Sequence, residues 1–191
     1  MYLISFVQVR EALLKKAEYL DQIGDKEACI EAVRQTTEKT VGLGNRMDLV
    51  FLNIRVGLFF TDHSIIKANI AKAHQMLEEG GDWDRRNRLK VYEGLYMMSI
   101  RDFSAGSQLF LDGVSTFTSY ELTSYIKLVE FAVIISVPAL DRSDLHKEVI
   151  KGSEILHQLP DTKKYLFSLY NCQYADFFQV CTEVCPLGGW C

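Results

Sequence analysis

Apolar residues recur along the chain at intervals of three and four, and short stretches rich in Gly, Asp or Pro interrupt the recurrence. This spacing places the apolar side chains on one face of an α-helix and leaves polar side chains on the other. The pattern predicts helices over residues 10–23, 25–41, 46–61, 62–78, 82–101, 102–117, 118–137, 143–159 and 161–178. Because the breaks are short, successive helices should pack as antiparallel hairpins.

The breaks within the predicted hairpins recur at a regular interval. The breaks are Gly24-Asp25, Thr61-Asp62, Arg101-Asp102 and Asp141-Arg142, and their aspartates follow one another 37, 40 and 39 residues apart. Helix pairs with periods of about 34 to 47 residues are typical of tetratricopeptide-like and related α-solenoids. The sequence therefore predicts an all-α fold, a right-handed α-solenoid of tetratricopeptide-like helical hairpins. We expect it to cover residues 10–179, after an N-terminal extension of residues 1–9 and before a flexible Cys-rich tail of residues 180–191.

Residues that can cap a helix N-terminus stand at most of the predicted helix starts. The candidates are Asp25, Asp62 or Ser64, Asp82 or Asp84, Asp102, and Ser143 or Asp144. Thr118 with Glu121 resembles a capping box, which predicts another helix start there. Pro138 and Pro160 are expected to end helices, because proline disfavours helical geometry at the residue before it.

The segment Gly80 to Phe103, GGDWDRRNRLKVYEGLYMMSIRDF, has the clearest helical pattern. Its cations Arg85, Arg86, Arg88 and Lys90 cluster in the first two turns. They fit either a solvated helix start neutralised by nearby aspartates or a surface that docks an acidic partner or a phosphate. We favour structure or protein contact, because cations near a helix N-terminus gain nothing from the macrodipole. Trp83 is expected to staple the turn onto the neighbouring repeat, with an interface anchor as the alternative role.

Composition narrows the class of protein. The 191 residues carry a formal charge of −4, which gives no attraction to phosphate and argues against a nucleic-acid partner. The longest apolar run, residues 131–140, is about half of the ~20 residues that a membrane-spanning helix needs. The five cysteines include three in the last eleven residues and form no disulfide framework. We therefore expect a reduced, soluble, intracellular protein.

No pattern in the chain predicts a catalytic, cofactor or metal site. His63 and His74 return to one helix face, but they lie about 16 Å apart along the axis, too far to share an ion. Cys181, Cys185 and Cys191 lack the spacing of a zinc site, so a thiol- or metal-dependent activity is the weaker alternative. Cys172 is expected to be a small core residue.

The last predicted helix is rich in aromatic residues, and we expect it to expose them together with Leu166 and to favour self-association. Together with the charged cluster, it completes the set of predicted protein-interaction residues. These are Trp83, Arg85, Arg86, Arg88, Lys90, Tyr170, Phe177 and Phe178.

The stretches EALLKKAEYLDQIGDKEACIEAVRQT, EEGGDWDRRNRLKVYEGLYMMSIRDF and LFLDGVSTFTSYEL resemble the family of 26S proteasome non-ATPase regulatory subunit 6, a lid subunit of the regulatory particle in the PCI family. The resemblance runs from about residue 10 to 178 and is most specific at DWDRRNRLKVYEGLY. Subunit 1 of the COP9 signalosome belongs to a paralogous family and is the alternative.

The resemblance implies a non-catalytic scaffold that supports lid assembly in ubiquitin-dependent protein degradation, in cytoplasm and nucleus, with lid subunits and the ATPase ring as partners. Family members continue into a PCI domain with a winged helix, whereas this sequence ends at FFQVCTEVCPLGGWC, so we expect the solenoid without the C-terminal PCI winged helix. That departure leaves a second hypothesis open: a truncated adaptor that competes for lid partners.

Overall fold

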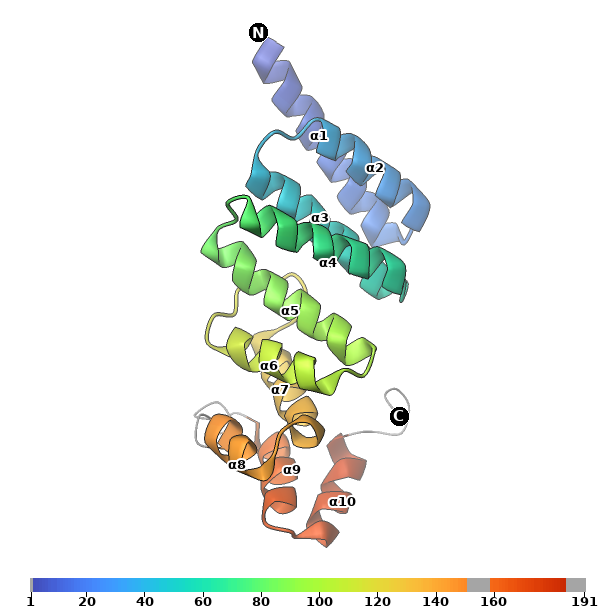
Figure 1. Cartoon of the computed structure of the whole chain (residues 1–191). Helices are drawn as coiled ribbons and strands as arrows, with labels where there is room; N and C mark the ends of the chain where they lie inside the picture. Colours follow the sequence, from blue (N-terminus) through green and yellow to red (C-terminus); the bar gives the residue numbers. More distant parts are fainter. Residues whose placement is uncertain (1, 151–158, 185–191) are drawn as a thin grey trace. The chain divides into compact units, whose positions relative to one another are not determined.

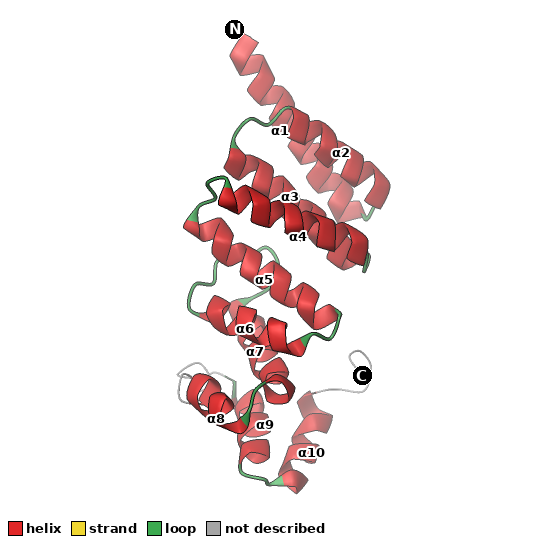
Figure 2. Ribbon diagram, in the orientation of Figure 1, coloured by secondary structure: helices red, strands yellow, loops and turns green. Residues whose placement is uncertain are grey.

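Figure 1 shows the computed structural model of the chain, which describes residues 2–150 and 159–184. Within these two ranges every regular element is a helix and none is a strand (Figure 2). The elements are α1 (Tyr2–Ile23), α2 (Lys26–Glu38), α3 (Leu43–Phe59), α4 (His63–Glu78), α5 (Trp83–Ser99), α6 (Phe103–Val114), α7 (Tyr125–Ala139), α8 (Arg142–Asp144), the π-helix η1 (Leu145–Ile150), α9 (Pro160–Tyr170) and α10 (Tyr174–Val184). The predicted all-α fold of helical hairpins is confirmed.

Four turns between paired helices share one backbone geometry. In each, one residue adopts a φ of 52° to 76°, and the N–H that follows it donates to the carbonyl five residues earlier at 2.8 to 3.1 Å. The left-handed residues are Gly24, Thr61, Arg101 and Cys172. This is the Schellman closure, which satisfies the carbonyls that a helix end leaves unpaired.

An aspartate follows the left-handed residue in the first three of these turns and caps the next helix. Asp25 accepts a hydrogen bond from the N–H of Ala28 at 3.1 Å, and Asp102 accepts one from Ala105 at 3.2 Å. Asp62 accepts from the N–H groups of Ser64 and Ile65. The turns predicted at these three aspartates are confirmed.

The prediction of one last helix over residues 161–178 is wrong. Cys172 takes the left-handed conformation, and the N–H of Gln173 donates to the carbonyl of Ser168 at 2.8 Å, so the segment divides into α9 and α10. Pro160 is the first residue of α9, where its missing N–H costs nothing. The predicted turn at Asp141-Arg142 exists, but the Asp141 side chain makes no capping hydrogen bond.

Two predicted helix starts also need correction. The capping box at Thr118 is wrong: α7 begins at Tyr125, and Ser124 accepts the capping hydrogen bond from the N–H of Lys127 at 3.3 Å. The residue before α8 is Asp141, so neither Ser143 nor Asp144 caps that helix. The rest of the predicted 143–159 helix, residues 151–158, lies outside the described residues.

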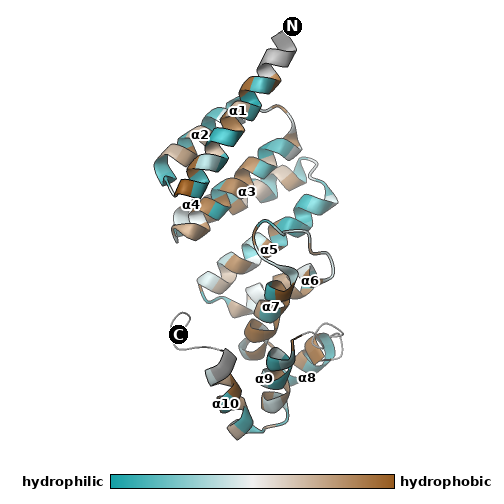
Figure 3. Cartoon of the chain, turned by 180° about the vertical axis from the view of Figure 1, so that it is seen from behind, coloured by the Kyte–Doolittle hydropathy of each residue, from teal (hydrophilic) through white to brown (hydrophobic). Residues whose placement is uncertain are grey.

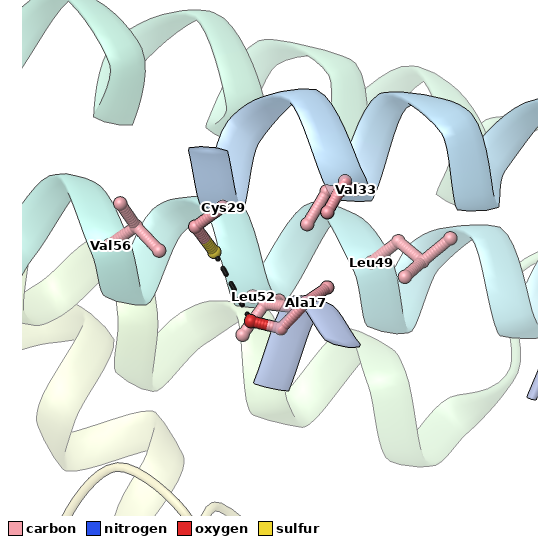
Figure 4. Close-up of a cluster of buried hydrophobic side chains, with 7 residues drawn as sticks. Ala17, Cys29, Val33, Leu49, Leu52 and Val56 are labelled. Carbon is pink, nitrogen blue, oxygen red and sulfur yellow. Dashed lines mark hydrogen bonds between the residues drawn. The ribbon is translucent and has the colours of Figure 1, made fainter. Parts of the chain in front are cut away.

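The chain divides into two compact units, residues 1–92 and 93–191, with the division inside α5. In the first unit, α1, α2 and α3 bring together a buried cluster that Figure 4 shows in close-up. Its members are Ala17, Cys29, Ala32, Val33, Leu49, Leu52 and Val56. The small side chains on α1 and α2 permit the close approach that the sequence predicts for this pair.

Cys29 is fully buried in this cluster, and its thiol donates to the carbonyl of Ala17 at 3.5 Å. Burial raises the pKa of this thiol from 9.0 to about 11. The unfolded chain therefore loses the proton at a lower pH than the folded chain. This contribution to stability is complete below pH 9, and it is lost as the pH rises towards 11.

We predict that the free energy of unfolding of the wild type falls by about 2 kcal/mol more than that of Cys29→Ala between pH 9 and pH 11. Urea titrations at several pH values, followed by circular dichroism, would measure the two slopes. Equal slopes would show that the Cys29 thiol titrates as in the unfolded chain.

The second unit has its own core, in which α7, η1 and α9 meet. The buried members are Val129, Val133, Leu145, Val149 and Leu166. Helix α7 is apolar around much of its circumference, as its brown colour in Figure 3 shows. Such a helix is stable in water only when neighbours cover several sides of it.

The first and the last described helices extend beyond the domain boundaries that the sequence predicts. Helix α1 begins at Tyr2, and α10 continues to Val184. The assignments of residues 1–9 as an extension and 180–191 as a tail stay predictions. None of the helices in the described ranges is long and apolar enough to span a bilayer.

Candidate protein-interaction surfaces

The start of α5 is fixed by Asp82. Its carboxylate accepts a hydrogen bond from the N–H of Arg85 at 2.9 Å and a second one from the Arg85 guanidinium at 2.6 Å. The backbone N–H and the neighbouring guanidinium lower the pKa of Asp82. The cap that the sequence predicts for this helix is therefore present, and it also orients the first cation of the charged cluster.

Arg85 reaches from α5 to α3. Its Nε and Nη2 donate to the two carboxylate oxygens of Asp48 at 3.1 and 2.7 Å, which is the bidentate geometry that guanidinium and carboxylate favour. Gly44 makes room for this bridge, because a Cβ there would lie 2.9 Å from Cζ of Arg85. The hydrogen bonds to Asp48 raise the pKa of Arg85.

Arg88 also binds Asp48, and it contacts an aromatic side chain of the core. Its guanidinium donates to Asp48 at 3.3 Å and lies over the ring of Phe51, 4.9 Å from the centroid. Phe51 in turn stacks on Tyr92 at 4.8 Å, and the Tyr92 hydroxyl accepts from Arg55 at 3.0 Å. One face of residues 82–92 is thus committed to the packing of α5 on α3.

The other predicted interaction residues near the start of α5 differ in their exposure. Trp83 is 65% exposed, so the prediction that it staples the turn is wrong, and its alternative role as an interface anchor stays a prediction. Arg86 is exposed and Lys90 is half-buried. Trp83 and Arg86 are therefore the exposed side chains among these residues, and their contact with a partner protein stays a prediction.

The aromatic residues near the end of the described chain divide between two environments. Tyr170 is half-buried: its ring stacks on His146 at 5.4 Å and lies beneath Arg142, whose guanidinium also donates to the Tyr170 carbonyl at 2.7 Å. Phe177 packs against Tyr165 at 5.1 Å, whereas Phe178 is 66% exposed.

Leu166 and Cys172 depart from their predicted environments. Leu166 was expected on the exposed aromatic face but is fully buried in the core of the second unit. Cys172 was expected in the core but lies exposed in the turn before α10, where its sulfur accepts a hydrogen bond from Arg142 at 3.6 Å. This hydrogen bond lowers the pKa of the Cys172 thiol.

Among the described residues, no three His, Cys, Asp or Glu side chains lie close enough together to hold a metal ion. Cys185 and Cys191 of the predicted tail lie outside the described residues.

The family model for 26S proteasome subunit RPN7 matches residues 6–148, well over half of the chain. The chain belongs to the RPN7 family. It is 49% identical over 180 residues to 26S proteasome non-ATPase regulatory subunit 6 of Caenorhabditis elegans, a match that covers 90% of this chain and 44% of the relative. It is 47% identical over 174 residues to the protein of that name from Oryza sativa, covering 90% and 45%. Saccharomyces cerevisiae 26S proteasome regulatory subunit RPN7 is 33% identical over 179 residues, covering 91% and 42%.

This RPN7-family chain spans less than half the length of these relatives. Of the two families that the sequence resembles, the matching model is that of the proteasome subunit. The charged cluster at 82–92 lies inside the matched range, whereas the aromatic residues of α9 and α10 lie beyond it.

Sequence reasoning missed Asp48, whose carboxylate binds both Arg85 and Arg88. One signal was present: Asp48 is the only acidic residue of α3, in a helix that is otherwise largely apolar. A lone carboxylate on such a helix needs a cationic partner, because burial without one is costly. The pattern does not say which of the cations along the chain supplies it.

We predict a coupling energy of about 1 kcal/mol between Asp48 and Arg85 in a double-mutant cycle of Asp48→Asn and Arg85→Gln. The value is modest because the Asp48 side chain stays 40% exposed and the Arg85 side chain 21% exposed. Urea unfolding of the four proteins would measure it. The exposed pair of Arg34 and Glu31 on α2 is the control and should couple much more weakly. Equal coupling in both pairs would contradict a structural role for Asp48.

Proposed function

We propose that this chain acts as a non-catalytic scaffold that binds other subunits of the 26S proteasome lid and supports lid assembly in ubiquitin-dependent protein degradation. The observation that carries the proposal is the match of residues 6–148 to the family model of a 26S proteasome subunit. Its relatives are named as regulatory subunits, which supports a role without catalysis. Such a role places the chain in the cytoplasm and nucleus, with the ATPase ring as a further neighbour.

The architecture is consistent with this proposal. Helical hairpins bury their apolar faces against one another and present their outer faces and turns to partners. The charged side chains with the most specific pattern, Arg85 and Arg88, are used to hold α5 on α3. We therefore assign partner contact to the exposed Trp83 and Arg86, and to Phe178 on α10.

The test is affinity purification of the tagged chain from cells at near-native expression, followed by quantitative mass spectrometry. We expect the other lid subunits to co-purify. Trp83→Ala with Arg86→Ala should reduce their recovery, and so should Phe178→Ala. Tyr19→Ala is the matched control, because Tyr19 is an exposed aromatic residue on α1 outside the proposed contacts.

Failure of all lid subunits to co-purify would overturn the proposal. Recovery of a single lid subunit, without the others, would favour the competing adaptor over the assembled scaffold. Unchanged recovery with the Trp83, Arg86 and Phe178 variants, but intact binding of the wild type, would refute the assigned contacts alone.

We also propose that α10 mediates self-association. Tyr174 and Phe178 are one helical turn apart and are both exposed, so they form an apolar strip that another molecule can cover. Light scattering should show a rise in mass with concentration, and Tyr174→Ser with Phe178→Ser should abolish it. A wild type that stays monomeric at high concentration would contradict this expectation.

A further inference from the structure

A groove opens in the first unit where three helices meet. It lies between the end of α2, the start of α3 and the C-terminal half of α4, and its volume is about 220 Å³. Leu43 and Met76 give it an apolar lining, while Arg46, Lys72 and Glu79 bring charges to it. These residues lie away from the Asp48 bridge and take no part in the surfaces described above.

The two cations of the groove keep unused donors. Nε of Arg46 donates to the carbonyl of Thr40 at 2.6 Å, which fixes the guanidinium in place. Its two terminal nitrogens have no partner among the described residues, and the ammonium of Lys72 has none there either. Glu79, in contrast, already accepts from the side-chain amide of Gln75 at 3.2 Å. The groove is therefore lined by two cations and one carboxylate, which leaves it a net positive charge.

The N-terminus of α3 adds to the positive electrostatic potential of the groove. Gly42 precedes the helix and has no side chain to cap it, so the first N–H groups of α3 lack a side-chain acceptor. Leu43, the first residue of that helix, also lines the groove. An anion placed there would gain from the free N–H groups and from the helix dipole as well as from the two cations.

The size of the groove limits what can occupy it. Pockets for cofactors and drug-sized molecules usually measure about 300–1,000 Å³. At 220 Å³ this solvent-open groove is smaller than such pockets and has room for about one large side chain. A peptide segment in which Asp or Glu stands beside a large apolar residue can supply both an apolar side chain and a carboxylate.

We propose that this groove docks an acidic peptide segment of a partner protein. One large apolar side chain of the segment contacts Leu43 and Met76, and an adjacent carboxylate binds Arg46 and Lys72. The attraction is charge-assisted and weakens as salt is raised. This inference does not depend on the proposed lid function, because it follows from the lining of the groove.

The test begins with a random dodecapeptide library displayed on phage and selected on the 191-residue chain. Enriched peptides should carry Asp or Glu next to a large apolar residue. Lys72→Glu should weaken their binding at least tenfold by fluorescence polarisation, which corresponds to about 1.4 kcal/mol. Glu79→Gln should strengthen it about two- to threefold, because it removes a like charge from the groove.

Lys67→Glu is the matched control: Lys67 is an exposed lysine of the same helix that does not line the groove. The affinity of the Lys67→Glu variant for the selected peptides should stay within about twofold of that of the wild type. Circular dichroism should show that both lysine variants fold alike. Lys72 is the better reporter than Arg46, since Arg46 also holds the carbonyl of Thr40.

Two results would overturn the proposal. One is a selection that enriches no peptide able to distinguish the wild type from Lys72→Glu. The other is equal loss of binding with Lys72→Glu and Lys67→Glu, which would mean that the helix attracts acidic peptides through its general charge and not through the groove.

Discussion

Replacing Phe51 with alanine should lower the free energy of unfolding by about 3–5 kcal/mol. Phe51 is fully buried on α3, stacks on Tyr92 at 4.8 Å and supports the guanidinium of Arg88 at 4.9 Å. Its removal leaves a cavity and also takes away the aromatic face under a partly buried cation. The loss should therefore exceed what the apolar area alone accounts for.

Urea unfolding followed by circular dichroism would measure this loss. The control is Phe59→Ala, the same substitution on the same helix at a side chain that is 75% exposed. Its effect should stay within about 0.5 kcal/mol of zero. Similar losses at the two positions would show that Phe51 does not pack as described.

Gly94→Ala should destabilise the second unit by about 1–3 kcal/mol. A Cβ at this position of α5 would lie 2.7 and 2.8 Å from two ring carbons of Phe110, which is fully buried on α6. Because Phe110 is fully buried, either its ring must shift against its neighbours or the two helices must move apart. The crowding outweighs the gain of about 1 kcal/mol that alanine normally brings to a helix interior.

Gly106→Ala on α6 is the matched control for Gly94→Ala. There the nearest atom to a new Cβ is Cδ1 of Ile135 at 3.3 Å, the end of a flexible side chain. We expect this variant to be neutral or slightly more stable in thermal unfolding. Phe110→Leu should recover part of the stability of Gly94→Ala, and failure to do so would indicate a cause other than this contact.

The hairpin turns could be predicted from the sequence because their determinants are local. Asp25, Asp62 and Asp102 each cap the helix that follows them, and each comes directly after a left-handed residue that closes the helix before. A cap and a closure use backbone groups within five residues, so no distant part of the chain is needed to form them.

The environments of some residues depend on tertiary packing and could not be predicted from the sequence pattern. Cys172 takes the left-handed position without being Gly or Asn, and its thiol accepts from Arg142, thirty residues away. Thr118 has a capping pattern, yet its hydroxyl is buried with no hydrogen-bond partner among the described residues, and Ser124 caps α7 instead.

Residues 82–92 show most clearly which features the sequence determines and which ones the tertiary structure determines. The helical start at Asp82 and the clustering of the cations follow from the sequence alone, because capping and periodicity act over one or two turns. Which cations meet a partner and which hold the fold depends on Asp48, 37 residues before Arg85. Only the packing of α5 on α3 brings that carboxylate within hydrogen-bond distance, since a contact of this range is set by the tertiary fold.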